Sequence, residues 1–326
     1  MSRRTGSADL PLHGGRVPTW LATRMATLGR VITEAIVVEY GRDELLRRLA
    51  HPFWFQSFGA VMGMDWHSSG ITTSVIGALK RGLDPVRDEL GIHVCGGRGK
   101  HSRKTPEELR AVGERTGLDA TPLERASRLV AKVDSAAVQD GFDLYLHGFF
   151  VTDDGHWCVV QQGMSDAWGT ARRYHWLSEG LEGFLDSPHS AIDGENQGTI
   201  VNLADVRAAR SRDAGLALVH EGPDRTIDVL RRLRDGSAAR DLFTEPLPER
   251  EPSPEAPLPH LQMPDRQDVH ASDVLLRRLH GTLAAAAENG PTDYSELLLT
   301  PGVGARTVAS LAMVAEVVHG APSRFS

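Results

Sequence analysis

The stretch DLYLHGFFVTDDGHWCVVQQ, residues 143–162, decides the fold of the first part of the chain. Residues 143–151 and 156–162 are rich in the aromatic and β-branched side chains that strands favour. Between them, Asp153-Asp154-Gly155 is typical of a tight hairpin turn. The stretch therefore predicts a pair of antiparallel strands.

Around this hairpin, apolar residues recur mostly at helical spacing. We expect a mixed α+β body in which helices pack against a small antiparallel sheet. Helices are predicted over 18–40, 42–50, 71–83, 105–117, 121–138, from about 205 and over 224–235, and strands over 92–94 and 200–203.

Residues 244–264 contain seven prolines and four glutamates and show no apolar periodicity. Such a composition predicts an extended linker. We therefore expect three parts: an α+β body over 1–243, the linker over 244–264, and a small all-helical unit over 265–326.

The totals exclude several classes of protein. With 326 residues and a net charge of −7, the chain is no basic coat protein, so any DNA contact must come from local patches. Cys95 and Cys158 lie far apart, which argues against a disulfide framework or a cysteine zinc site. The sequence has no secretory signal and no apolar run of 18 residues, so we expect a cytoplasmic protein without a membrane span or organic cofactor.

Near the C-terminus, the sequence LTPGVGART (299–307) joins two apolar helical patterns, 294–299 and 305–318. The segment resembles a helix-hairpin-helix, a module that binds the DNA backbone through amides at a helix N-terminus. Val308 departs from the alanine that is usual in that module, and an ordinary helical corner with a glycine C-cap is the alternative. The resemblance assigns DNA binding to Gly302, Val303, Gly304, Ala305, Arg306 and Thr307.

A second candidate for phosphate binding is the loop GGRGKHSRK (96–104). Its glycines expose backbone N–H groups and its cations supply charge, although it does not match the Walker pattern. The alternative is a solvated basic loop. The candidate DNA contacts here are Arg98, Lys100, Arg103 and Lys104.

The sequence DWHSSG (65–70) precedes a predicted helix. Asp65 and His67 are candidate ligands of a divalent metal, and His67 is also a candidate general base. The alternative is a capping loop with a packed tryptophan.

Further candidates lie on or beside the hairpin. Asp134, His147 and Gln161 resemble the layout of a metal-dependent nuclease, with Asp134 as a third metal ligand, but Gln161-Gln162-Gly163 stands where Glu-x-Lys is usual. A buried hydrogen-bond network is the alternative. In ARRYHW (171–176), Arg172 and His175 are candidates for binding phosphate or for catalysis. The alternative there is a surface helix that packs Tyr174 and Trp176 inward.

Together these motifs resemble the uncharacterised prokaryotic family catalogued as domain of unknown function 763. The resemblance covers nearly the whole chain but implies no established activity. It depends on HGGRVPTWL (13–21), DWHSSG (65–70), GGRGKHSRKTP (96–106), QQGM (161–164), ARRYHW (171–176) and PGVG (301–304).

The leading hypothesis is a DNA repair or processing protein, a metal-dependent nuclease that uses Mg²⁺ or Mn²⁺ on structured or single-stranded DNA without sequence specificity. The residues leave open whether the chain is an enzyme. The alternatives are a nucleic-acid-binding adaptor, a DNA glycosylase, or an enzyme acting on small phosphorylated molecules.

Overall fold

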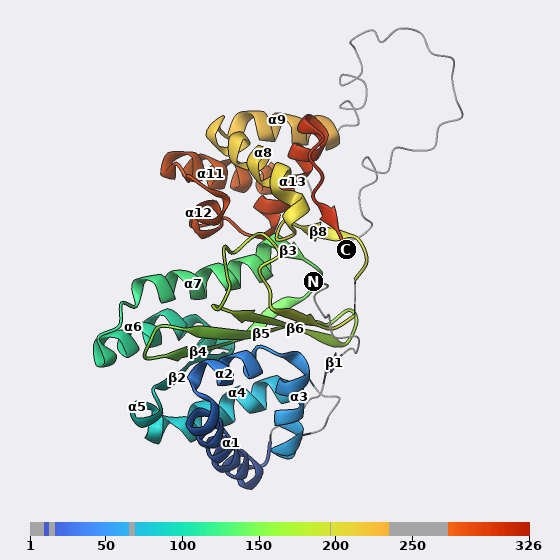
Figure 1. Cartoon of the computed structure of the whole chain (residues 1–326). Coiled ribbons are helices and arrows are strands. Elements are labelled where there is room, and N and C mark those ends of the chain that lie inside the picture. The colour runs from blue at the N-terminus through green and yellow to red at the C-terminus, as the bar shows by residue number, and fades with distance from the viewer. Residues whose placement is uncertain (1–9, 13–16, 65–68, 196, 235–272) are drawn as a thin grey trace. The chain divides into compact units, whose positions relative to one another are not determined.

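The computed structural model describes residues 10–12, 17–64, 69–195, 197–234 and 273–326. The chain forms two compact units (Figure 1). Unit 1 comprises residues 1–135 and 140–197, and unit 2 comprises residues 136–139 and 198–326. The mixed α+β class is as predicted.

The centre of unit 1 is an antiparallel sheet in the order β1-β6-β5-β4-β2, with β7 also paired to β6. The predicted hairpin is confirmed: β4 and β5 pair from Asp143↔Met164 to Val151↔Trp157. The strands are β1 (Leu10–Pro11), β2 (Ile92–Arg98), β4 (Asp143–Thr152), β5 (Trp157–Ser165), β6 (Thr170–Leu177) and β7 (Ala191–Asp193).

Helices cover both faces of this sheet (Figure 1). A hydrophobic core lies on one face, where Phe55 and Ile76 from the helices meet Phe150 and Val160 from the strands. That face is covered by α1 (Thr19–Tyr40), α2 (Arg42–Leu49), α3 (Pro52–Val61) and α4 (Gly70–Leu83). The opposite face is covered by α6 (Thr105–Thr116) and α7 (Thr121–Lys132). Short helical turns η1 (Asp84–Val86), α5 (Arg87–Leu90) and η2 (Gly99–Lys104) flank β2.

Two segments differ from the helices considered for them. ARRYHW, for which a surface helix was the alternative interpretation, forms strand β6, with Tyr174 and Trp176 fully buried. The helix expected over 121–138 ends at Lys132 and continues as a π-turn, η3 (Val133–Ala137), and then as strand β3 (Val138–Gln139). The π-turn widens the helix at Asp134, which places that carboxylate against the sheet.

In its described residues, unit 2 combines the helices α8, α9, α11, α12 and α13 with a sheet in the order β3-β8-β9. Its core includes Leu218, Leu283, Leu297 and Leu311. The elements are β8 (Ile200–Asn202), η4 (Val206–Ala208), α8 (Ala209–His220), α9 (Pro223–Arg234), α11 (Asp273–Asn289), α12 (Tyr294–Leu299), α13 (Ala305–His319) and β9 (Arg324–Phe325).

The division into units falls at a different point from the predicted domain boundaries. Helices α8 and α9 precede the predicted linker in sequence, yet α8 packs against α13 and α9 packs against α11. The linker itself, 244–264, lies outside the described residues. None of the helices that the structure describes is both long enough and apolar enough to span a membrane.

Candidate functional site

The turn between α12 and α13 has a buried anchor and an exposed tip. Asp293 caps α12, since its Oδ1 accepts a hydrogen bond from the backbone N–H of Glu296 at 2.8 Å. Within the turn, Val303 is 1% exposed and its N–H donates to the carbonyl of Thr300 at 3.1 Å. Val303 therefore fixes the turn, while Pro301 and Gly302 face solvent.

The two glycines of the turn have different roles. Gly302 has φ of +87°, a conformation that side chains rarely adopt. Gly304 is the N-cap of α13 with extended backbone, φ −150° and ψ −172°. A Cβ added at Gly304 would meet no atom within 4 Å. Gly302 therefore shapes the turn, whereas Gly304 leaves open space beside the start of α13.

The first turn of α13 presents backbone N–H groups without a side-chain cap among the described residues. Val308 donates to the carbonyl of Gly304 at 3.0 Å, so the N–H groups of Ala305 and Arg306 precede the first helical bond. Both residues are exposed, whereas Thr307 is buried. The positive end of the helix dipole therefore lies at an open surface.

Strand β3 holds this end of α13 in place. The side-chain amide of Gln139 donates to the carbonyl of Ala305 at 2.8 Å and to the carbonyl of Ala136 at 3.0 Å. The bond to Ala305 uses its carbonyl and leaves its N–H free. Gln139 thus fixes the start of α13 without bonding the backbone N–H groups there.

The basic loop of unit 1 forms the end of β2 and the turn η2. Ser102 Oγ donates to the carbonyl of Gly99 at 2.6 Å, and Thr105 Oγ1 donates to the carbonyl of Ser102 at 2.8 Å. These bonds hold the loop together, and the Arg98 guanidinium lies over the ring of Tyr145, 5.6 Å from its centroid. Arg98, Lys100, Arg103 and Lys104 are all exposed, and none of them forms an ion pair with another described residue.

Asp134 lies at the centre of a buried hydrogen-bond network on the α7 face of the sheet. Its side chain is fully buried. Oδ1 accepts from His189 Nε2 at 2.5 Å, and Oδ2 accepts from Gln161 Nε2 at 2.5 Å and from Trp176 Nε1 at 2.9 Å. Three donors therefore stabilise the carboxylate within the protein.

Gln161 extends this network to His147 and Ser127. The His147 Nδ1–H donates to Gln161 Oε1 at 2.7 Å, and His147 Nε2 accepts from Ser127 Oγ at 3.0 Å. Burial lowers the pKa of His147, which favours the neutral ring that this pattern requires. The structure thus brings the predicted residues Asp134, His147 and Gln161 together. They form a buried hydrogen-bond network, which was the alternative to a nuclease site.

Arg172 lies on the same face but in a neighbouring cluster. Its Nη1 donates to Asp140 Oδ2 at 3.1 Å, and the same oxygen accepts from the hydroxyl of Tyr174 at 2.6 Å. Burial raises the pKa of Asp140, although Arg172 and Tyr174 oppose this shift. Burial also raises the pKa of Tyr174, so its hydroxyl stays protonated. Arg172 is therefore occupied by an internal partner.

The opposite face of the sheet carries a second set of buried polar side chains. Arg173 Nη2 donates to Gln56 Oε1 at 2.8 Å and pairs with Asp193, while Nη1 donates to Thr72 Oγ1 at 3.2 Å. His175, also on this face, donates from Nδ1 to the carbonyl of Leu49 at 3.1 Å. Burial lowers the pKa of His175 far below its usual value. His175 is therefore separated by the sheet from Asp134 and His147.

The strand register aligns three of the sequence motifs, GGRGKHSRKTP, QQGM and ARRYHW, on one row across the sheet. Arg98 is opposite Leu146, Leu146 is opposite Gln162, Gln162 is opposite Arg173, and Arg173 is opposite Asp193. Gln162 Nε2 also donates to the carbonyl of Ser69 at 3.0 Å, at the end of the DWHSSG motif. Asp65 and His67 themselves lie outside the described residues.

Sequence reasoning missed several partners in these clusters. Thr72, Asp193 and Gln56 lie outside the sequence motifs, and their roles depend on helices and strands that meet only in the fold. In Pro188-His189-Ser190 the sequence offers His189 as one more candidate histidine, but it does not indicate the partner Asp134.

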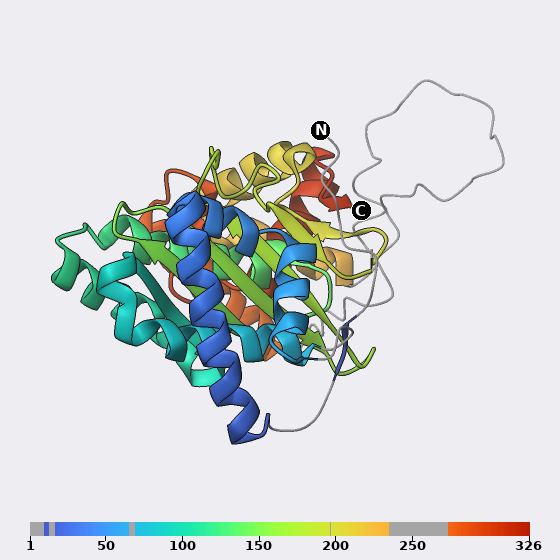
Figure 2. The ribbon, with the colours of Figure 1, turned by 60° about the horizontal axis from the view of Figure 1, so that its bottom comes forward.

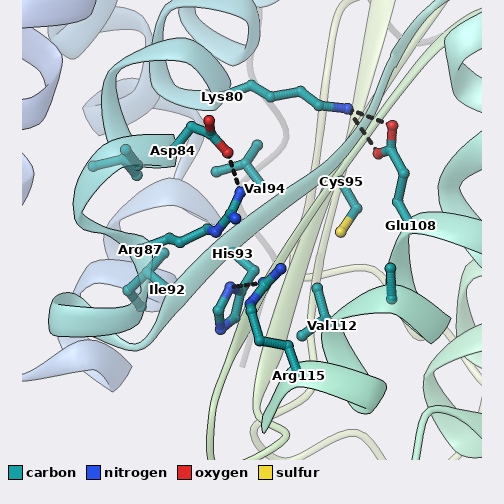
Figure 3. Close-up of a pocket in the computed structure, with 12 residues that line it drawn as sticks. Lys80, Asp84, Arg87, Ile92, His93, Val94, Cys95, Glu108, Val112 and Arg115 are labelled. Carbon is teal, nitrogen blue, oxygen red and sulfur yellow. Dashed lines mark hydrogen bonds and ion pairs between the residues drawn. The ribbon is translucent and has the colours of Figure 1, made fainter.

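A pocket of about 190 Å³ lies beside β2, at the edge of the sheet (Figure 3). Lys80 Nζ donates to the carbonyl of Gly96 at 2.7 Å and pairs with Glu108, also at 2.7 Å. Glu108 in turn accepts from the N–H of Gly96 at 2.6 Å. These two side chains satisfy the outward-facing peptide groups of Gly96 and so protect the sheet edge.

Two further side chains of this pocket, Arg115 and His93, bond each other. Arg115 donates to His93 Nδ1 at 2.9 Å, and His93 Nε2 bonds Asp153 Oδ1 at 2.7 Å. Burial raises the pKa of the Cys95 thiol to about 12, which keeps it protonated. In contrast to the basic loop, this pocket has its cations engaged by internal carboxylates and a histidine.

For a metal, no group of three or more His, Cys, Asp or Glu side chains with suitable geometry exists within the described ranges. The predicted ligands Asp65 and His67 are outside those ranges. To bind a metal ion, Asp134 would have to give up the hydrogen bonds that it accepts from Gln161, Trp176 and His189.

Comparison with known proteins gives one family. A family model described as "Protein of unknown function (DUF763)" matches residues 6–326. Neither a curated protein nor a solved structure matches the chain.

Proposed function

Because the chain belongs to the DUF763 family of proteins of unknown function, its activity has to be argued from its own residues, and we propose that it is a cytoplasmic DNA-binding protein of DNA repair or processing. It would hold the sugar-phosphate backbone without reading the base sequence. Phosphate contacts carry most of the affinity in such binding and little sequence information.

The observation that carries the proposal is the open start of α13. Ala305 and Arg306 are exposed residues, no described side chain caps the start of α13, and a Cβ added at Gly304 would meet no atom within 4 Å. A phosphate oxygen bound there would gain backbone hydrogen bonds and the favourable end of the helix dipole. The Arg306 side chain adds a positive charge at the same place.

The basic loop is the proposed second phosphate contact. Arg98, Lys100, Arg103 and Lys104 are exposed and have no internal ion pair among the described residues. In a chain with a net charge of −7, four exposed cations within seven residues provide a local attraction for phosphate.

A DNA titration at several salt concentrations tests the proposal, with Gly304→Val beside Gly183→Val. Valine fits the extended backbone at Gly304 and meets no neighbour, so the fold is retained while the approach to the amides is obstructed. Gly183 is exposed and, like Gly304, has no atom within 4 Å of an added Cβ, which makes it a control. We expect Gly304→Val to weaken binding about tenfold. Equal affinity of both variants would contradict the proposed contact.

Metal-dependent phosphodiester hydrolysis is the second candidate function. The bond from Gln162 to the carbonyl of Ser69 favours it, since this bond ties the end of DWHSSG to the row that begins at the basic loop. Asp65 and His67 are the proposed ligands of Mg²⁺ or Mn²⁺, which would polarise the phosphate and activate water.

Incubation of labelled DNA with Mg²⁺ or Mn²⁺ tests this candidate. Asp65→Ala should abolish cleavage and retain binding, whereas Asp166→Ala, at an exposed position on another loop, should leave both unchanged. Binding without any product from structured or single-stranded DNA would favour the non-enzymatic adaptor.

A further inference from the structure

Helix α1 carries an apolar stripe on the side that faces away from its own unit. Leu28, Val31 and Val38 are 38%, 49% and 75% exposed, and Ala35 between them is also exposed. These four positions are separated by three, four and three residues, the spacing of one helical seam in a coiled coil. Figure 2 shows α1 along its whole length at the front of unit 1.

The opposite side of α1 is already committed to the core. Met25 and Ile36 are buried there, and α1 packs closely against α4. At Gly82 of α4, an added Cβ would meet the carbonyl oxygen of Ala26 at 2.3 Å, so the two backbones are in direct contact. Rotation of α1 to bury its outer stripe would break this contact. The stripe is therefore a fixed exterior feature of unit 1.

Two unpaired charges lie toward the ends of the stripe. Arg24 is exposed near the start of α1 and Glu39 is exposed near its end, and neither forms an ion pair with another described residue. Between them, Arg30 and Glu34 pair with each other at 3.4 Å. A parallel second copy would place like charges together. An antiparallel second copy would place the Arg24 end beside the Glu39 end, twice by symmetry.

We propose that the outer stripe of α1 binds the same stripe of a second copy of this chain, in an antiparallel arrangement. Leu28 of each copy then packs near Val38 of the other, and Val31 packs near Ala35. The ion pair between Arg24 and Glu39 sets the direction. This association is independent of the proposed DNA contacts, because α1 contains none of them.

Sedimentation velocity on the full chain, freed of nucleic acid, tests the association. The wild type is expected to sediment as two chains. Val31→Glu should sediment as one chain with an unchanged circular-dichroism spectrum, since this position is exposed. Val206→Glu, at a valine that is 56% exposed on another element, should still sediment as two chains. A single-chain wild type, or an unchanged mass for Val31→Glu, would overturn the proposal.

The direction of the pair has its own tests. Arg24→Glu and Glu39→Arg should each weaken association about fivefold, and the double variant should restore it. For cross-linking, Leu28→Cys combined with Val38→Cys should form disulfides between chains. Leu28→Cys alone should not, because the two copies of position 28 would be about 15 Å apart along the axis. Cross-linking by Leu28→Cys alone would overturn the antiparallel arrangement. The natural Cys95 and Cys158 are buried and do not interfere.

Discussion

Arg172 and Arg173 are consecutive in sequence, yet their guanidinium groups lie on opposite faces of the central sheet and pair with different carboxylates. Arg172 pairs with Asp140 on the α7 face, and Arg173 pairs with Asp193 on the face covered by α1–α4. The strand conformation of β6 causes this separation, because successive side chains alternate between faces. Both arginines therefore act inside unit 1, and the exposed cations of the basic loop remain the candidates for phosphate in that unit.

The Arg173 pair should contribute strongly to stability. Arg173→Met removes a fully buried guanidinium and leaves Asp193 and Gln56 without their partner. Breaking a buried pair from one side costs about 3–5 kcal/mol in the free energy of unfolding. Urea unfolding measures this loss. The exposed Arg110→Met, which breaks the surface pair with Glu124, should cost about 0–1 kcal/mol. Equal effects would contradict the buried role of Arg173.

His147 should make the protein less stable in acid. Burial lowers its pKa in the folded state below the ordinary value of about 6.5, so the unfolded state takes up the proton first. Its stabilising contribution is present above pH 6.5 and is lost as the pH falls through the folded pKa. In His147→Gln, the free energy of unfolding should therefore fall less steeply between pH 7 and 5, by up to about 1.4 kcal/mol per pH unit. His175 is present in both the wild type and the variant, so it does not cause a difference between them. If the free energy of unfolding fell equally steeply with pH in both proteins, His147 would not be the cause of the acid sensitivity.

The cations of the basic loop should determine part of the salt dependence of DNA binding. In Lys100→Ala/Arg103→Ala, two phosphate contacts are lost, and the slope of log affinity against log salt should become shallower by about 2. The decrease should be similar for different base sequences. Arg125→Ala, at an exposed arginine of α7, should leave the slope unchanged. If both variants gave the wild-type slope, the loop would have no part in binding.

The two glycines of the α12–α13 turn should differ in their effect on stability. Gly302→Ala forces a side chain into a left-handed conformation and should cost about 1–2 kcal/mol. Gly304→Ala places a methyl group in extended backbone with no neighbour and should change stability by less than about 0.5 kcal/mol. Thermal unfolding of both variants measures the difference. A large loss at Gly304 would show that its surroundings are not open.

The sequence predicts those elements whose signals are local. The Asp153-Asp154-Gly155 turn and the strands on either side of it follow from residue type. Helix α12 ends and helix α13 starts close to Pro-Gly-Val-Gly, as the sequence predicts. Strand β6 could not be predicted in this way. Both of its faces are buried and both carry charge, so its pattern lacks the polar alternation of a half-exposed strand.

The candidate site shows the same limit. The grouping of Asp134, His147 and Gln161 was predicted from their nearness to the hairpin, and the structure does bring them together. The burial of these three side chains depends on Trp176 and His189. Both residues bond Asp134 and lie more than 40 residues away from it in sequence. Burial by distant segments is a property of packing, and no local motif indicates it.

Hydrogen exchange of the backbone amides in residues 301–308, with and without DNA, tests the central claim most directly. In the free protein, the N–H groups of Ala305 and Arg306 precede the first helical bond of α13 and should exchange fast. If they bind phosphate, saturating DNA should slow their exchange, and Gly304→Val should reduce this protection. Unchanged exchange in this segment at saturating DNA would contradict the account.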